Sequence, residues 1–416
     1  MKNRYERYHV STLLARIAEP PRTLIFVFGP RQSGKSTLVK QALALTTLES
    51  RYFSVDMLEP DVVSPYLTEQ EQFKSRNIVH DSAWLIRIWQ EARKEAERHE
   101  SGFVLVLDEI QNIPQWSSIV KGLWDADRFA DRNLRVVILG SSPLPLQQRL
   151  AESLAGRFEL IRVEHWSFRE MANAFNFDLP SYVYFGGYPG AAHFINDQSR
   201  WREYIRNSII TPNIDKDILA MTRVDKPILL KRTFELCSSY SGQILSYTKM
   251  LGQLQSAGNT TTLAHYLNIL THAGLLAGLE KYAGQLFRRR ASSPKLNILN
   301  TALMSVNSGY NFEDAQVDRT FWGRLIESTV GAHLYNTGMP EIKLHYWRKS
   351  PHEVDFVLKR GPRLIGIEVK SASHKNTSLG LTEFNKLFQP ECVFKVGGQG
   401  IPLEEFLMFP ASHWFD

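Results

Sequence analysis

The sequence predicts a chain of the α/β class with two to four domains, and three observations lead to this prediction. With 416 residues, the chain is longer than one ordinary hydrophobic core requires. Near its start, "RTLIFVFGPRQSGKSTLVKQAL" (22–43) reads as an apolar strand, a glycine-bounded loop and a helix. Near its end, two strand-like runs, "VDFVL" (354–358) and "LIGIEVK" (364–370), carry charged residues that a buried strand lacks unless they have partners.

The composition is that of a folded soluble protein and favours a cytoplasmic location. Apolar residues make up 43% and charged residues 22% of the chain. It has no uncharged apolar run of about 18 residues and no apolar signal-peptide core, so we expect neither a membrane span nor export. The two cysteines, Cys237 and Cys392, show no pairing pattern, which suits a reducing compartment. The net charge of +6 permits a nucleic-acid partner without requiring one.

Residues 29–36 match the phosphate-binding pattern G-x-x-x-x-G-K-S in full. The glycines let backbone N–H groups surround a phosphate, and the helix that follows presents its positive N-terminus to it. We expect Lys35 to reach the β- and γ-phosphates of ATP and the Ser36 hydroxyl to complete the shell of a Mg²⁺ ion. A plain glycine turn is the alternative, but the strand before the loop and the helix after it favour nucleotide binding.

A second apolar run, "GFVLVLDEIQNIP" (102–114), has the form of a buried parallel strand that ends in two carboxylates. We expect Asp108 to hold Mg²⁺ through water and Glu109 to polarise the water that attacks the γ-phosphate. A third run, "RVVILGSSPL" (135–144), ends in Ser141 and Ser142, which could contact the γ-phosphate or cap the next helix. The predicted nucleotide contacts are Gly29, Pro30, Arg31, Gln32, Ser33, Gly34, Lys35, Ser36, Thr37, Asp108 and Ser141.

The segment 228–300 predicts three short helices followed by a hairpin with a basic tip, which is the order of a winged helix. The tip carries Arg288, Arg289, Arg290 and Lys295, a density suited to contacts with DNA phosphates. Winged helices also serve as plain lids of ATPases, and basic turns are often only solvated, so DNA contact is one of two interpretations here.

The C-terminal 110 residues combine a helix that contains Glu327 with the two charged strands. This order, helix-Glu, strand-Asp and strand-Glu-x-Lys, resembles the PD-(D/E)XK nuclease superfamily. Asp355 and Glu368 would bind a Mg²⁺ ion, with Glu327 joining from the helix and Glu353 as a weaker candidate. Lys370 shares a strand face with Glu368 and would activate the attacking water. The alternative is a Glu368–Lys370 salt bridge on an exposed strand face.

Four stretches, "GPRQSGKSTL", "LDEIQNIPQWSSIVKGLWD", "GSSPLPLQQRLAESLAGRFELIRVEHWSFREM" and "GGYPGA", resemble the AAA-type ATPases of bacteria and archaea that carry a C-terminal DUF4143 domain. The resemblance covers nearly the whole chain. It implies a P-loop AAA-type core (1–165), a helical lid or linker (166–225), a winged helix (226–300) and a restriction-endonuclease-like α/β domain (301–416). Asn300 stands where this family usually has an aspartate, which puts any charge role there in doubt.

The resemblance also implies a homo-oligomer, in which Arg157 would reach the nucleotide of a neighbouring subunit as an arginine finger. A plain surface charge is the alternative for this residue. We therefore predict a Mg²⁺-dependent ATPase that binds or remodels DNA, branched DNA included, and whose C-terminal domain binds or cleaves phosphodiesters. The alternatives are a nucleotide-dependent switch whose C-terminal domain recognises DNA or a protein without cutting, and a regulator that does not bind DNA.

Overall fold

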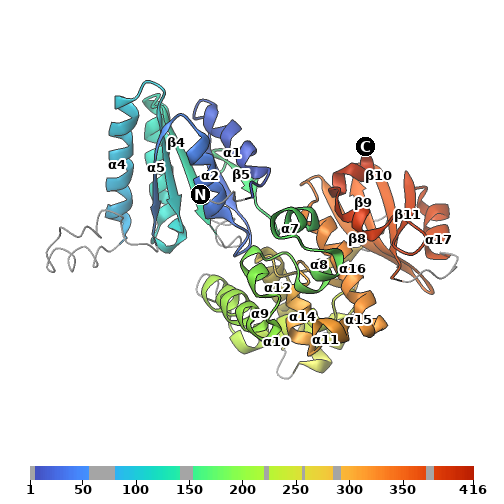
Figure 1. Cartoon of the computed structure of the whole chain (residues 1–416). Helices are drawn as coiled ribbons and strands as arrows, with labels where there is room; N and C mark the ends of the chain where they lie inside the picture. Colours follow the sequence, from blue (N-terminus) through green and yellow to red (C-terminus); the bar gives the residue numbers. More distant parts are fainter. Residues whose placement is uncertain are drawn as a thin grey trace. The chain divides into compact units, whose positions relative to one another are not determined.

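The computed structural model describes residues 5–55, 80–140, 153–219, 224–254, 258–283, 292–371 and 379–416. These residues form two compact units, Met1–Val163 and Glu164–Asp416, and each unit has its own β-sheet flanked by helices (Figure 1). The predicted α/β class is therefore confirmed. Among the helices in these ranges, none has the length and apolar character that crossing a bilayer requires.

The first unit contains a sheet of parallel strands in the order β2-β3-β4-β1-β5. Its strands are β1 (Leu24–Phe28), β2 (Glu49–Ser54), β3 (Phe103–Asp108), β4 (Leu134–Gly140) and β5 (Phe158–Arg162). Its helices are α1 (His9–Ala18), α2 (Lys35–Leu45), α4 (Ser82–Arg98) and α5 (Trp116–Phe129), with a 3₁₀ turn η2 (Ile110–Asn112). Every residue of β1, β3 and β4 is buried, as expected of parallel strands covered on both faces.

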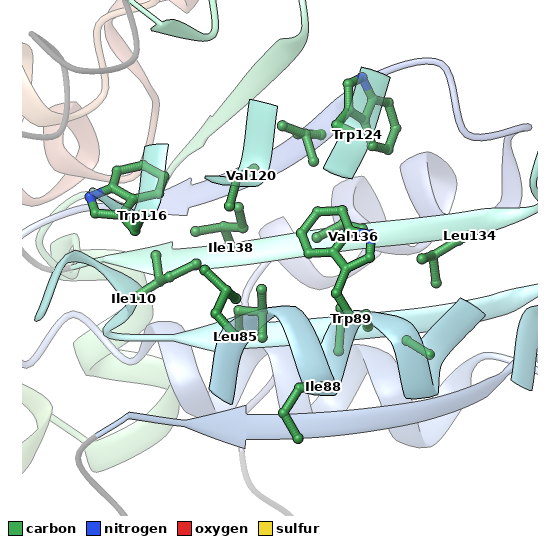
Figure 2. Close-up of a cluster of buried hydrophobic side chains, with 14 of the residues drawn as sticks. Leu85, Ile88, Trp89, Ile110, Trp116, Val120, Trp124, Leu134, Val136 and Ile138 are labelled. Atoms are coloured by element: carbon green, nitrogen blue, oxygen red, sulfur yellow. The ribbon is translucent and has the colours of Figure 1, made fainter. Parts of the chain in front are cut away.

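Helices α4 and α5 cover one face of this sheet, and α1 and α2 cover the other (Figure 1). Because side chains alternate along a strand, β4 turns Val136 and Ile138 towards α4 and α5, while Val137 and Leu139 belong to the opposite cluster. Figure 2 shows Trp89, Trp116 and Trp124 packed with the residues of β4. This packing fixes the carboxyl edge of the sheet, where the predicted phosphate loop and Asp108 lie.

The second unit begins with helices and ends with a mixed sheet. Its helices are α7 (Phe168–Phe175), α8 (Leu179–Phe185), α9 (Gln198–Tyr204), α10 (Pro227–Ser239), α11 (Tyr247–Gln253), α12 (Thr260–His272), α14 (Ala302–Ser308), α15 (Phe312–Val317), α16 (Arg319–Asn336), α17 (Leu379–Phe388) and α18 (Leu403–Leu407). Short 3₁₀ or π turns are η3 (Pro189–Phe194), η4 (Ile205–Ile210), η5 (Asn213–Ile218) and η6 (Ala411–Phe415). Its strands are β6 (Leu276–Lys281), β7 (Lys295–Ile298), β8 (Ile342–Lys349), β9 (His352–Arg360), β10 (Arg363–Val369) and β11 (Cys392–Val396).

Three helices, α10, α11 and α12, precede an antiparallel pair of strands, β6 and β7, as the sequence predicts. This pair does not end the segment, because β6 also pairs in parallel with β8 and joins a sheet of order β11-β10-β9-β8-β6-β7. The predicted boundaries at residues 225 and 300 therefore lie inside one compact unit, and the domain limits stay predictions. Residues 284–291, which include three of the predicted basic tip residues, lie outside the described ranges.

The Gly-Gly-Tyr-Pro turn that follows α8 packs against Asn300. Asn300 Oδ1 accepts a hydrogen bond from the Gly187 backbone N–H at 3.2 Å, and Asn300 Nδ2 lies 3.3 Å from His165 Nδ1. Gly186 has a φ of 71°, and a Cβ there would lie 2.0 Å from Asn300 Oδ1. These contacts show that Asn300, where the resembled family has an aspartate, holds a buried turn of the second unit as a neutral side chain.

The buried His333 on α16 leads us to expect that the folded protein loses stability in acid. Its Nε2 lies 2.7 Å from the Phe409 carbonyl oxygen, and burial lowers the pKa of His333 to about 4. The unfolded chain binds this proton with an ordinary pKa of about 6.5, so unfolding becomes easier as the pH falls from about 6.5 to about 4. We expect a loss of about 3 kcal/mol in unfolding free energy across this window.

Urea unfolding at a series of pH values measures this loss. In His333→Gln the unfolding free energy should depend less on pH in this window. In His265→Gln, which changes an exposed histidine on α12, the dependence should persist. An equal pH dependence in the wild type and in His333→Gln would contradict the assignment to His333.

Candidate functional site

The loop between β1 and α2 adopts a conformation that requires its glycines. A Cβ on Gly29 would lie 1.9 Å from the Val163 carbonyl oxygen, and Gly34, which precedes α2, has a φ of 90°. Lys35 is the first residue of α2, so the helix begins where the motif predicts. The other predicted nucleotide contacts in this stretch are Pro30, Arg31, Gln32, Ser33, Ser36 and Thr37. Strand, loop and helix therefore follow in the order that a phosphate site needs.

The ammonium group of Lys35 lies within the loop itself. Its Nζ donates hydrogen bonds to the carbonyl oxygens of Gly29 and Pro30, each at 2.9 Å, and the residue is only 8% exposed. A second cation supports the loop from the N-terminal segment, since Arg7 Nη1 donates to the Ser33 carbonyl oxygen at 3.0 Å. The sequence gives no signal for Arg7, because its contact spans 26 residues.

Three oxygen-bearing side chains meet at the end of β3. Ser36 Oγ donates to Asp108 Oδ2 at 2.9 Å, and the hydroxyl of Tyr52 on β2 donates to the same oxygen. Burial, together with the bond to Asp108, raises the pKa of Tyr52 well above its ordinary value. Carboxylate and hydroxyl oxygens are the ligands that Mg²⁺ prefers, so the group around Asp108 fits the predicted ion. Tyr52 was not predicted from the sequence.

Glu109 follows Asp108 directly and has a left-handed backbone conformation, with a φ of 57°. Such a conformation is uncommon for a residue with a side chain and is concentrated at functional sites. The side-chain amide of Gln111 donates to Glu109 Oε2 and so orients this carboxylate. Glu109 therefore leaves the strand in a fixed position next to Asp108, as a base that polarises water requires.

Arg157 lies just before β5 and forms a two-pronged ion pair within its own unit. Its Nε and Nη2 lie 2.6 Å and 3.0 Å from the two carboxylate oxygens of Asp125 on α5. The hydrogen bond from Arg157 lowers the pKa of Asp125. The structure therefore gives Arg157 a local partner, and its contact with a neighbouring subunit stays a prediction. The predicted nucleotide contact Ser141 lies outside the described residues.

A second group of charged residues lies in the second unit, around Lys295. The sequence placed Lys295 in the basic tip of a hairpin, where it would contact DNA phosphates or solvent, and this prediction was wrong. Lys295 is the first residue of β7 and is fully buried, because β7 pairs with β6 and packs beneath α16 and β9. Its Nζ lies 2.6 Å from Glu327 Oε1, 3.3 Å from Asp355 Oδ1 and 3.7 Å from Glu353 Oε1. We call Glu327, Glu353 and Asp355 the carboxylate cluster.

The charges in this cluster keep Lys295 protonated. Burial alone would lower the pKa of Lys295, but the negative charges of Asp355 and Glu327 outweigh it and raise that pKa. For Glu327 burial is the larger effect, and it raises the pKa to about 7 although Lys295 opposes it. Lys295 is therefore protonated at neutral pH, and the neighbouring Glu327 can gain or lose a proton close to that pH.

The predicted metal ligands on β9 and β10 have other partners. Asp355 Oδ2 accepts a hydrogen bond from the Val369 backbone N–H at 2.8 Å. Glu368 is 9% exposed, and its Oε1 lies 2.5 Å from Lys370 Nζ. The salt bridge considered as the alternative is thus present, although Glu368 is buried rather than exposed. In the described parts of the chain, no group of three or more His, Cys, Asp or Glu side chains is arranged to hold a metal ion.

Three family models match the chain and cover most of its length. Residues 21–172 match an AAA domain, residues 176–313 a domain of unknown function (DUF8612), and residues 322–414 another domain of unknown function (DUF4143). The chain thus combines an AAA domain with a C-terminal DUF4143 domain, which confirms the resemblance drawn from its motifs. The AAA domain supports nucleotide binding.

Proteins of several microbes are similar to this chain. Uncharacterized proteins of Mycobacterium tuberculosis and Mycobacterium bovis are each 27% identical over 66% of this chain and 60% of their own length. One of Haemophilus influenzae is 23% identical over 65% of this chain and 66% of its own. The Walker-type ATPase PABY2304 of Pyrococcus abyssi has a similar fold, with a TM-score of 0.50 and 14% identity over 73% of this chain and 95% of that protein.

Proposed function

We propose that this chain, in which an AAA domain precedes a DUF4143 domain, is a Mg²⁺-dependent ATPase that acts on DNA. The observation that carries the proposal is the convergence at the carboxyl edge of the first sheet, where Ser36 of the phosphate loop is bonded to Asp108 of β3. The strand that holds Asp108 continues into Glu109, whose carboxylate accepts a hydrogen bond from the side-chain amide of Gln111. The proposed ion ligands thus meet at this edge, and the proposed base follows Asp108 directly in the chain.

Each residue of this site has one task in the hydrolysis. Lys35 exchanges its two carbonyl partners for oxygens of the β- and γ-phosphates. Ser36 and Asp108 would hold a Mg²⁺ ion, which would neutralise part of the phosphate charge. Glu109 accepts a hydrogen bond from the attacking water and polarises it, while Gln111 keeps the carboxylate aimed.

The second unit supplies the support for DNA as the partner. Helices α10, α11 and α12 with the β6–β7 pair have the order of a winged helix, a common DNA-binding module. Between these strands the sequence carries Arg288, Arg289 and Arg290, and the whole chain has a net charge of +6. Basic residues clustered in this way suit contacts with phosphates.

ATPase rates measured without DNA, with linear duplex, with single strands and with branched junctions, each with and without Mg²⁺, test the proposal. We expect no turnover without Mg²⁺ and a rate that at least one DNA form raises several-fold. Lys35→Ala serves as the control for contaminating ATPases. Tight ATP binding with slow turnover that no DNA changes would contradict an ATPase acting on DNA and favour a nucleotide-dependent switch.

Tyr52→Phe is expected to weaken the response of this site to Mg²⁺. The change removes the hydroxyl that donates to Asp108 Oδ2 and so orients the proposed ion ligand. Loss of such an orienting partner weakens metal binding about 10- to 100-fold, so the Mg²⁺ concentration for half-maximal ATPase rate should rise about tenfold. ATP affinity in the absence of Mg²⁺ should not change, and Tyr8→Phe, at an exposed tyrosine, should match the wild type. An unchanged Mg²⁺ dependence in Tyr52→Phe would contradict this role.

Arg157→Ala tests the proposed assembly. If Arg157 acts on the nucleotide of a neighbouring subunit, the variant should bind ATP normally but hydrolyse it at least about 10³-fold more slowly. Mixing it with Lys35→Ala subunits should restore part of the activity, because an intact Arg157 then faces an intact nucleotide site. Asp125→Asn is the matched control, since it removes only the local partner. Mixed oligomers without restored activity would exclude the trans role.

A further inference from the structure

We infer that Lys295 is a built-in cation of the carboxylate cluster, so that Glu327, Glu353 and Asp355 bind an ammonium group instead of a divalent metal. This inference concerns the second unit alone and does not depend on ATP hydrolysis. Joined to the proposed function, it implies that the DUF4143 domain engages DNA without metal-dependent cutting.

The geometry of Lys295 is that of a cation held from within the fold. Its side chain has no exposed surface, whereas the side chains of Glu327, Glu353 and Asp355 are 23%, 34% and 19% exposed. An ammonium group carries three N–H donors; this one lies 2.6 Å from Glu327 Oε1, donates to the backbone and carboxylate oxygens of Asp355 at 3.3 Å, and lies 3.7 Å from Glu353 Oε1. The lysine thus lies on the interior side of the cluster, where its ammonium group is the counter-charge of the carboxylates.

The lysine cannot leave this position by turning outward. Lys295 belongs to β7, where its backbone pairs with Leu279 of β6. Its Nζ also lies 5.0 Å from the centre of the Phe356 ring. A strand residue without solvent access can vacate the cluster only if β7 itself moves, so the ammonium is present whenever the unit is folded.

A divalent ion would compete with this ammonium for the same oxygens. Glu327 Oε1 and Asp355 Oδ1 both face Lys295 Nζ, and a Mg²⁺ ion binds its oxygen ligands at about 2.1 Å. Metal and ammonium would then be like charges in a largely buried site, which is costly. The second oxygen of Asp355 is already bonded to the Val369 backbone.

The charges around the cluster are nearly balanced without a metal. Glu353 also faces Arg348, whose Nε lies 3.7 Å from Glu353 Oε2. The three carboxylates are thus opposed by two cations, and Glu368 has a separate cation in Lys370. Each carboxylate that the nuclease pattern would give to a metal has a basic side chain as partner.

Mn²⁺ binding to the full chain without nucleotide tests the inference. Free Mn²⁺ is measured by electron paramagnetic resonance in an Asp108→Asn background, which removes the ion site of the first unit. With Lys295 present we expect no Mn²⁺ ion bound at the cluster up to about 1 mM. Lys295→Met should create one site per chain with at least tenfold tighter binding, and adding Asp355→Asn should abolish it.

Wild-type protein provides a second measurement in case Lys295→Met fails to fold. Fe²⁺ with ascorbate cleaves a backbone next to a bound metal, and we expect no cuts near residues 327 or 353–370. Cuts there that Asp355→Asn removes, or Mn²⁺ bound at the wild-type cluster, would overturn the inference. A folded Lys295→Met variant that gains no Mn²⁺ site would also overturn it, because the lysine would then not fill a cation position.

The same preparations separate this inference from the proposed function. Labelled linear and branched DNA should stay intact in Mn²⁺, and Asp355→Ala should behave as the wild type does. Metal-dependent cutting that Asp355→Ala abolishes would overturn the inference and leave the ATPase proposal standing. A rate of ATP hydrolysis that no DNA changes would contradict the proposed function without affecting the Mn²⁺ result.

Discussion

Glu109→Gln is expected to bind ATP as the wild type does and to hydrolyse it about 10²- to 10⁴-fold more slowly, which is the range for loss of a general base. The amide keeps the shape of the carboxylate and the contact with Gln111, but it cannot polarise the attacking water. Lys35→Ala should abolish both binding and turnover, because it removes the cation that the loop holds between Gly29 and Pro30. The two variants therefore separate phosphate anchoring from water activation.

Equilibrium binding of a fluorescent ATP analogue and single-turnover hydrolysis measure the two steps independently. Glu97→Gln, at an exposed glutamate of α4, is the matched control and should resemble the wild type in both assays. Unchanged single-turnover rates in Glu109→Gln would remove its assignment as the base. Loss of binding in the same variant would instead assign Glu109 to the nucleotide contacts.

The parts of the first site that the sequence predicts are those whose chemistry is local. Gly29 and Gly34 are needed by the backbone of the loop itself, and Asp108 and Glu109 end an apolar run whose composition predicts a buried parallel strand. Tyr52 lies 56 residues from Asp108, and their contact depends on the pairing of β2 with β3. Such a contact has no local signal, so one sequence alone cannot predict it.

The wrong placement of Lys295 has a different origin. The charged strands near the C-terminus were recognised because Asp355 and Glu368 interrupt apolar runs, and buried charges need partners. Lys295 opens the run "KLNIL" in the same way, but the arginines before it made it resemble part of a basic turn. The argument that a charge in a strand needs a partner predicts a buried ion pair there. The partner itself depends on β7 packing against α16.

Lys295→Met is expected to destabilise the second unit by about 3 kcal/mol, the lower end of the range for breaking a buried ion pair. The removal leaves Glu327 and Asp355 as close carboxylates without their shared cation, while their partial exposure to water limits the cost. Lys343→Met, on an exposed position of β8, should change stability by less than about 0.5 kcal/mol. Hydrogen exchange of peptides from β7, α16 and β9 measures the effect where it arises.

The partner variant decides whether charge or packing causes this loss. Adding Glu327→Gln to Lys295→Met removes a carboxyl group that the folded chain must otherwise keep charged without its cation or protonate at a cost in free energy, so the double variant should regain a substantial part of the lost stability. If methionine had instead failed to fill the space of the lysine stem, Glu327→Gln would restore nothing. A single Lys295→Met variant with wild-type exchange rates would show that the carboxylates do not need the lysine. Because Lys295 supplies the cation of the carboxylate cluster in place of a metal ion from solution, the stability of the second unit depends on this ion pair.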